Sequence, residues 1–210
     1  MKEILYDWGG ANVWLFHRIN NIHSEYLDQL MLLGTNLGGH AHFALYFALS
    51  AVAGVIAVSR CTKDDAAVRQ QTAQLWLTAL AVFSVAYLVD GAVLGWLKPL
   101  LDFPRPPLAL PSGSFFVVGE AEFHHSLPSG HSSFAMLVAA SLWPALKHWG
   151  RIGGTCFVLW VGLSRISLGA HFPADVVAGF LSSFVVVILV RWTITSVASV
   201  AARSIEPAGK

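Results

Sequence analysis

The sequence predicts an all-α fold, an integral membrane bundle of six transmembrane helices forming one domain over residues 1–210. Hydrophobic residues make up 55% of the chain and charged residues only 12%. That charged fraction is half of the roughly 25% typical of soluble domains. Eight tryptophans also favour a membrane protein, because Trp is enriched at the membrane–water interface.

Long apolar segments supply the expected spans, since a membrane helix needs about 20 mostly apolar residues. Five segments approach this length: 42–59, 74–97, 132–146, 152–168 and 174–192. A sixth segment, 26–39, is shorter and carries Asp28, so we expect a short or tilted first span there. Residues 1–25 are expected to form an interfacial segment, and residues 203–210 a loose tail.

The distribution of basic residues predicts an orientation for these spans. With six alternating spans, the long loop 98–128 lies on one side of the membrane. The opposite side then holds Lys2, Arg18, Arg60, Lys63, Arg69, Lys147, Arg151, Arg191, Arg203 and Lys210. Lys and Arg concentrate in cytoplasmic loops, so we expect the loop to face the periplasm from a bacterial inner membrane. The net charge of +1 gives no electrostatic case for nucleic acid.

Three polar clusters interrupt the apolar segments, and the six-span topology places all of them on the outward side. They are KPLLDFPRP at 98–106, PSGH at 128–131 and SRISLGAHFPAD at 164–175. Together they bring three cations, two imidazoles and one carboxylate: Lys98, Arg105, Arg165, His131, His171 and Asp175. This excess of positive charge suits a multiply charged anion, and Arg can bind phosphate bidentately. Backbone N–H groups at the helix start, Gly130 and His131, favour an anion as well.

The third cluster also predicts a local geometry. Pro173 suits the first position of a helix, and Phe172 before it is disfavoured in helical conformation. His171 is therefore expected just outside the last span, with Asp175 on its first turn, where a carboxylate is stabilised. Asp175 can accept a hydrogen bond from one ring nitrogen of His171 and leave the other as a nucleophile. His131 is the candidate general acid.

The spacings K-x6-R-P, P-S-G-H and S-R-x5-H-x3-D resemble the motifs of the type 2 phosphatidic acid phosphatase superfamily, which includes the vanadium haloperoxidases. The matching positions are Lys98, Arg105, Pro106, Pro128, Ser129, Gly130, His131, Ser164, Arg165, His171 and Asp175. The resemblance covers residues 98–175 directly, and the six-span layout is similar to the membrane branch of the family.

The resemblance implies hydrolysis of a lipid phosphate without a metal or other cofactor. His171 would attack phosphorus to form a phosphohistidine, Asp175 would orient it, and His131 would protonate the leaving group. The residues implied to hold the phosphoryl oxygens are Lys98, Arg105, Ser129, Gly130 and Arg165. Implied substrates include undecaprenyl pyrophosphate, phosphatidylglycerol phosphate, phosphatidic acid and the phosphates of lipid A, entering laterally from the membrane. The short loop 106–127, with few cations, favours undecaprenyl pyrophosphate or a similar lipid phosphate over a large multi-anionic headgroup.

Simpler interpretations stay open for single residues. Lys98 alone could snorkel at a span end, and residues 128–130 could form only a turn and a helix cap. Asp90 matches no motif, and a structural role is favoured for it. Residues expected outside the chemistry are His40, His42, Asp102, Glu120, Glu122, His124 and His125. A lipid phosphotransferase or a non-catalytic lipid-phosphate binder would use the same site, and the sequence indicates no oligomeric state.

Overall fold

The computed structural model of the protein describes residues 6–61 and 65–205, with side chains described as far as residue 201. All regular structure in these ranges is helical, which confirms the all-α fold class. The elements are η1 (Trp8–Gly10), α2 (Ala11–Asn20), α3 (Glu25–Leu37), η2 (His40–His42), α4 (Phe43–Ser59), α5 (Ala66–Leu101), α6 (Pro106–Ala109), α7 (Gly130–Leu142), α8 (His148–Ser167) and α9 (Pro173–Ile205). Lys2, Lys63 and Lys210 lie outside the described residues.

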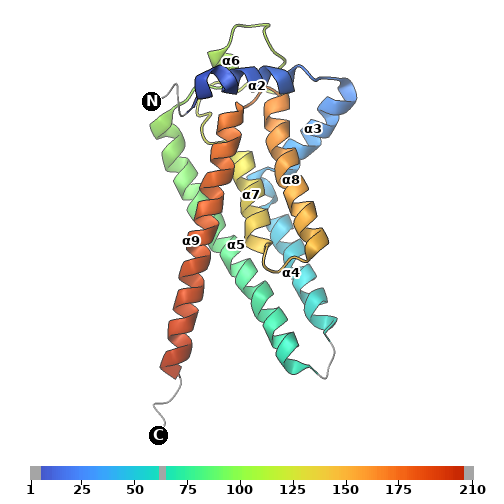
Figure 1. The fold of residues 1–210 in the computed structure, drawn as a ribbon, viewed down its shortest axis with the longest axis vertical. Coiled ribbons are helices and arrows are strands. Elements are labelled where there is room, and N and C mark those ends of the chain that lie inside the picture. Colours follow the sequence, from blue (N-terminus) through green and yellow to red (C-terminus); the bar gives the residue numbers. More distant parts are fainter. Residues whose placement is uncertain (1–5, 62–64, 206–210) are drawn as a thin grey trace.

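Helix α7 forms the centre of the bundle and packs against α5, α8 and α9 (Figure 1). Nine of its 13 residues are buried, which is the pattern of a helix surrounded on all sides. Its Phe134 and Leu137 join Val82, Phe83 and Val187 in the largest apolar core. The site-bearing start of α7 is thus held by three neighbouring helices.

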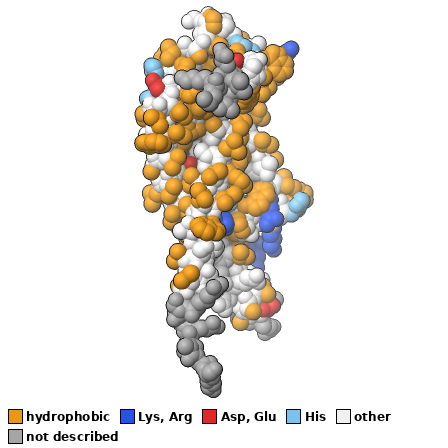
Figure 2. All heavy atoms as spheres, turned by 60° about the vertical axis from the view of Figure 1, so that its left-hand side comes forward, with side chains coloured by type: hydrophobic (Ala, Val, Ile, Leu, Met, Phe, Trp, Pro, Cys, Tyr) orange, Lys and Arg blue, Asp and Glu red, His pale blue; other side chains and the backbone are white. Residues whose placement is uncertain are grey.

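Three helical segments in the described part of the chain are long and apolar enough to cross a membrane: His40–Ser59, Ala66–Ala109 and Pro173–Ala201. They contain the spans predicted at 42–59, 74–97 and 174–192. Helix α7 has 13 residues, fewer than the about 20 that a span needs, so the spans predicted at 132–146 and 152–168 stay predictions. Figure 2 shows many apolar side chains on the face of the bundle that it draws, as expected for contact with lipid.

The N-terminal helix α2 lies across the end of the bundle where α9 begins (Figure 1). Its buried Asn20 donates from Nδ2 to the Phe116 carbonyl and accepts from the Phe116 N–H, both at 2.8 Å. Asn12 Oδ1 accepts from the N–H of Ala174 in the first turn of α9 at 2.9 Å. The prediction that Arg18 lies at the opposite end is therefore wrong, because these asparagines anchor α2 beside the start of α9.

The predicted first span, 26–39, is not a separate crossing. Helix α3 descends from the α2 end along α8, where Gly34 lies against the ring of Trp160. Helix α4 continues in the same direction, so that Gly54 lies against Trp76 near the start of α5. Helices α3 and α4 therefore run in the same direction, one after the other (Figure 1). The prediction of a separate first span is wrong, because hydropathy shows how apolar a segment is but not the direction in which it runs.

At the end of the bundle away from α2, helices α5 and α9 extend beyond the apolar segments predicted at 74–97 and 174–192. Helix α5 begins at Ala66, where the Asp65 carboxylate accepts from the Val68 N–H at 3.0 Å. Helix α9 runs to Ile205, so the predicted loose tail is wrong for residues 203–205, while 206–210 lie outside the described residues. Basic residues at the ends of helices away from α2 are Arg60, Arg69, Lys147 and Arg151.

A buried polar cluster joins α5, α7 and α9. The Asp90 carboxylate accepts from the Ser133 hydroxyl at 3.0 and 2.8 Å and from the Ser183 hydroxyl at 2.7 Å. All three side chains are fully buried. A buried carboxylate is costly without partners, so these hydrogen bonds account for Asp90 as a link between three helices, in line with the structural role favoured for it.

We predict that Gly179→Ala destabilises the contact between α7 and α9. A Cβ at Gly179 would lie 2.5 Å from the carbonyl oxygen of Ser129. Backbone atoms cannot rotate away, so the helices must separate, and such overpacking costs about 1–3 kcal/mol. Thermal unfolding in detergent should show a lower midpoint for this variant.

The matched control is Gly153→Ala in α8, because a Cβ at Gly153 meets nothing within 4 Å. This variant should unfold at the wild-type temperature or above it, since Ala is the better helix former. Equal midpoints for Gly179→Ala and the wild type would contradict this prediction and show that the contact between α7 and α9 accommodates a methyl group.

Candidate active site

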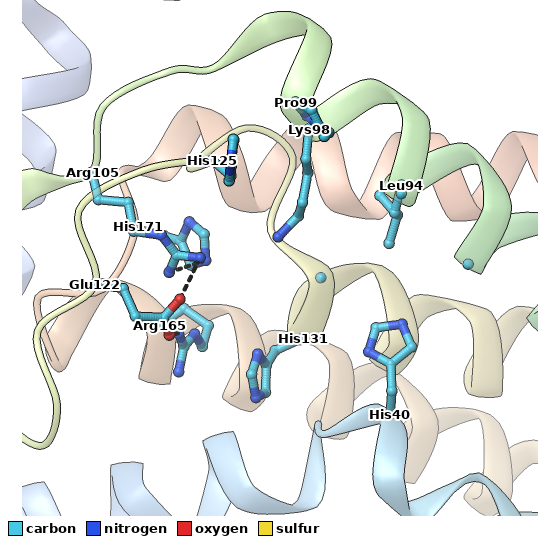
Figure 3. A pocket seen from close by; sticks show the side chains of 13 residues that line it. His40, Leu94, Lys98, Pro99, Arg105, Glu122, His125, His131, Arg165 and His171 are labelled. Carbon is cyan, nitrogen blue, oxygen red and sulfur yellow. Dashed lines mark hydrogen bonds and ion pairs between the residues drawn. The ribbon is translucent and has the colours of Figure 1, made fainter.

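The three motif clusters line one cavity of about 500 Å³ at the end of the bundle that α2 covers (Figure 3). Lys98 comes from the last turn of α5, Arg105 from the residue before α6 and Arg165 from the last turn of α8. His131 enters from the first turn of α7, and His171 from the turn before α9. The structure therefore brings together the three cations and two imidazoles that the sequence analysis singled out.

Asp175 lies behind His171, fully buried, and several donors surround its carboxylate. Oδ1 accepts from the Tyr6 hydroxyl at 2.9 Å. Oδ2 accepts from the Phe172 N–H at 2.9 Å and from the Ser126 hydroxyl. His171 Nδ1 lies 3.4 Å from the same Oδ2 and 3.3 Å from Ser126 Oγ. The expected His171–Asp175 pair is thus part of a larger hydrogen-bonded group.

These contacts assign the tautomer of His171. Nδ1 faces two oxygens, so it carries the proton, and Nε2 is left with its lone pair toward the cavity. Arg105 Nη1 lies 3.2 Å from Nε2 and donates to it. Burial lowers the pKa of His171 to about 3, although the hydrogen bond to Asp175 opposes this. The imidazole is therefore neutral at physiological pH, as a nucleophile requires.

Tyr6 and Ser126 keep the Asp175 carboxylate in place. Burial and the negative charge of Asp175 raise the pKa of Tyr6, so the phenol keeps its proton and remains a donor. Its ring also packs on Phe103, with the ring centroids 4.4 Å apart. Neither residue belongs to a motif, and sequence reasoning missed both. Ser126 lies close to PSGH in the sequence, but no spacing rule connects Tyr6 to a site so far along the chain.

Positive charge accumulates in the cavity. A Cβ built on Gly130 would lie 3.7 Å from Lys98 Nζ, so the ammonium group approaches the start of α7, which is the positive end of its helix dipole. Arg105 and Arg165 are nearly buried, with 5% and 7% of their surface exposed. Among the described residues that line the cavity, Glu122 is the only acidic one.

Ser129 has a different position from the other phosphate-binding candidates. Its side chain is fully buried, and Oγ accepts from the Ser132 N–H at 3.5 Å and from the Ser132 hydroxyl at 3.0 Å. It therefore caps α7, which is the simpler of the two interpretations of this turn. Gly130 lines the cavity, and the first N–H groups of a helix have no partner within the helix, so the start of α7 is suited to an anion.

Several residues that were expected outside the chemistry lie at the cavity. Glu122 keeps the solvent exposure expected of a loop charge, with 55% of its side chain exposed, but its Oε2 also pairs with Arg105 Nη2 at 2.7 Å, a contact that the sequence did not indicate. His40 and His125 also line the cavity. Asp102 Oδ1 lies 3.1 Å from His125 Nδ1 and 3.4 Å from His124 Nδ1, which ties the loop to the end of α5.

The structure predicts that His171 stays neutral far below the usual histidine range. Its pKa of about 3 in the folded chain is lower than the roughly 6.5 of an unfolded histidine. The neutral imidazole therefore contributes stability above pH 6.5 that is lost as the pH falls toward 3. Nitrogen-15 NMR of histidine-labelled protein should show a neutral Nδ1–H ring at pH 5, in the signal that disappears in His171→Ala. A titration of that signal with a midpoint near pH 6.5 would contradict this.

Comparison with known proteins identifies the family of this chain. Residues 79–197 match the sequence profile of the PAP2 superfamily. The lipid A 1-phosphatase of Rhizobium johnstonii is 30% identical over 107 residues, which cover 50% of this chain and 42% of the relative. A lipid A 1-phosphatase of Rhizobium etli is also 30% identical over 107 residues, 44% of its length. The chain thus spans less than half the length of the curated relatives it matches.

Two solved structures share the fold. The crystal structure of Aquifex aeolicus LpxE superposes with a TM-score of 0.69 at 20% identity, over 86% of this chain and 94% of that one. The transmembrane PAP2 type phosphatidylglycerolphosphate phosphatase from Bacillus subtilis gives a TM-score of 0.60 at 22% identity, over 97% and 90%. With more than half of the chain matched by the family profile and the fold shared, the chain belongs to the PAP2 superfamily.

Proposed function

We propose that this protein hydrolyses the phosphate or pyrophosphate group of a membrane lipid, without a metal, through a phosphohistidine at His171. One observation carries the proposal. The neutral Nε2 of His171 opens into a cavity that also receives Lys98, Arg105 and Arg165. A neutral imidazole nitrogen that directs its electron pair toward the cavity, surrounded by cations, is the arrangement that phosphoryl transfer needs once Arg105 turns from Nε2 to the phosphate.

The proposed reaction has two steps. His171 Nε2 attacks phosphorus and takes over the phosphoryl group, while the bond to the leaving oxygen breaks and His131 gives that oxygen a proton. Burial and the charge of Arg165 lower the pKa of His131 to about 3 in the free protein, so this proton has to arrive with the bound phosphate, whose negative charge favours the protonated imidazole. Water then attacks the phosphohistidine, His131 accepts the proton, and phosphate leaves. Arg105 now donates to Nε2, so in the complex its guanidinium would turn from the imidazole to the phosphoryl oxygens.

The roles of the remaining groups follow from their positions. Lys98, Arg165 and the Gly130 N–H would stabilise the negative oxygens, and Asp175 would hold His171 and stabilise its positive charge after attack. Ser129 would act through the cap of α7 and so would orient the Gly130 N–H.

The surroundings support a lipid substrate that enters laterally. The cavity extends along α5 past Gly91, Leu94 and Gly95, and α5 is one of the helices apolar enough to cross a membrane. The relatives named above act on lipid A and phosphatidylglycerolphosphate, so lipid phosphates are the class we propose, with undecaprenyl pyrophosphate as a further candidate. The basic residues at the far end of the bundle support a periplasmic site in a bacterial inner membrane.

Phosphate release by the purified protein in detergent tests the function directly. We predict turnover of at least one lipid phosphate in the presence of EDTA, and its loss in His171→Ala. His148→Ala, a change at the start of α8 at the far end of the bundle, is the control and should keep wild-type turnover. Equal release by the His171→Ala variant would contradict the proposal, and a phosphorylated acceptor lipid in place of free phosphate would indicate a phosphotransferase.

Tyr6→Phe and Ser126→Ala are each predicted to lower kcat by about 10- to 150-fold, because each removes one hydrogen bond to a buried carboxylate, worth about 1.5–3 kcal/mol. KM should change little, since neither side chain lines the cavity. The matched control is Tyr26→Phe, because Tyr26 is 90% exposed. A wild-type kcat in both variants would mean that Asp175 needs no help in orienting His171.

A further inference from the structure

The carboxylate of Glu122 occupies the position between two cavity arginines. Its Oε2 lies 2.7 Å from Arg105 Nη2, and its Oε1 lies 3.9 Å from Arg165 Nη2. Figure 3 shows the side chain reaching from its loop to these guanidinium groups. Both arginines belong to the family motifs, so the group that they hold in this structure is an anion supplied by the chain itself.

Glu122 also stands where two cavities meet. The main cavity of about 500 Å³ is lined by Glu122, His131 and Arg165. A second cavity of about 260 Å³ is lined by the same three residues, together with Thr35 and the loop around Gly119. Among the described residues, Glu122 is the only acidic one that lines both. Withdrawal of its side chain would therefore free the arginines and widen the space around them.

The Glu122 side chain is free to leave. It is 55% exposed, so its charge can return to water without a large desolvation cost. Arg165 shows a related feature from the other side, because its Nε is buried without a hydrogen-bond partner. The arginine pair thus has donor capacity that the single carboxylate does not fill.

We propose that Glu122 determines specificity as a built-in competitor that admits dianionic phosphate monoesters and rejects singly charged phosphodiesters. This inference rests on the proposed function, because it concerns the same phosphate site. Displacing the carboxylate costs every anion the same free energy, so only a strongly attracted ligand overcomes it: near Lys98, Arg105 and Arg165 a dianion exceeds the carboxylate by one negative charge, whereas a monoanion does not exceed it. A membrane enzyme needs this discrimination, since most bilayer phospholipids are phosphodiesters in large excess.

Charge balance explains why a carboxylate at position 122 excludes weakly bound anions better than a neutral side chain would. Without Glu122, the nearly buried guanidinium groups would attract any passing anion, including the diester headgroups that surround the bundle. With Glu122, each binding event is an exchange of one anion for another. The exchange favours the ligand with the higher charge, and it also helps to expel product phosphate once a proton reduces its charge.

Soluble probes separate this role from a purely structural one. Dimethyl phosphate is a monoanion and methyl phosphate is a dianion at pH 8, and calorimetric titration of the detergent-solubilised protein measures both. We expect Glu122→Gln to bind both probes more tightly, dimethyl phosphate by about tenfold, because neither anion has to displace a charge-assisted contact. In the wild type, dimethyl phosphate should leave the site mostly empty at concentrations at which methyl phosphate saturates it. Glu25→Gln, an exposed carboxylate in the first turn of α3 that lines neither cavity, should match the wild type.

The outcomes are distinguishable. Unchanged or weaker binding of dimethyl phosphate by Glu122→Gln would overturn the inference and leave Glu122 as a residue that only positions the arginines. Glu122→Asp withdraws the carboxylate by one methylene and should give intermediate binding, so it provides the test if the Gln variant does not fold. The titrations measure binding and require no turnover. A failure of lipid hydrolysis would therefore contradict the proposed function but would leave the role of Glu122 in anion binding to be decided by the titrations.

Discussion

The site depends on the buried carboxylate of Asp175. It receives hydrogen bonds from Tyr6 near the N-terminus, from Ser126 in the loop before α7 and from the backbone at the start of α9. The carbonyl of Asp175 also accepts from the Ser129 N–H at 2.9 Å, which ties the start of α7 to the start of α9. A charge buried this deeply needs all of these donors, so the same contacts that make it tolerable also assemble the site and orient His171.

The second constraint is the excess of positive charge that faces Asp175 across His171. Lys98, Arg105, Arg165 and the start of α7 converge on one cavity, and Glu122 offsets part of this charge. Asp175 cannot neutralise them from inside the cavity, because it lies behind the imidazole. A site of this kind binds anions strongly by default and dianions most strongly, so a competing carboxylate can keep the weakly bound monoanions out. The loop carboxylate supplies that competition within the chain.

Much of the site was predictable from sequence, because its residues follow rules for helix ends. Pro173 begins α9 and Ser129 caps α7, as their positions in the motifs indicate. Tyr6 and Glu122 were not predictable, since their contacts join segments that no local pattern relates; Tyr6 lies 169 residues from Asp175. Hydropathy predicts the apolar helices at 42–59, 74–97 and 174–192 that are long enough to cross a membrane, but it does not predict the direction of a helix, so it gives segment 26–39 as a separate crossing.

Trapping the covalent intermediate tests the central claim most directly. The protein would be mixed with a phosphorus-32-labelled lipid phosphate, denatured within milliseconds and digested for peptide mapping. The account predicts an alkali-stable, acid-labile label on the peptide that contains His171, absent from His171→Ala. A label on the His131 peptide, or turnover without any labelled peptide, would contradict nucleophilic attack by His171.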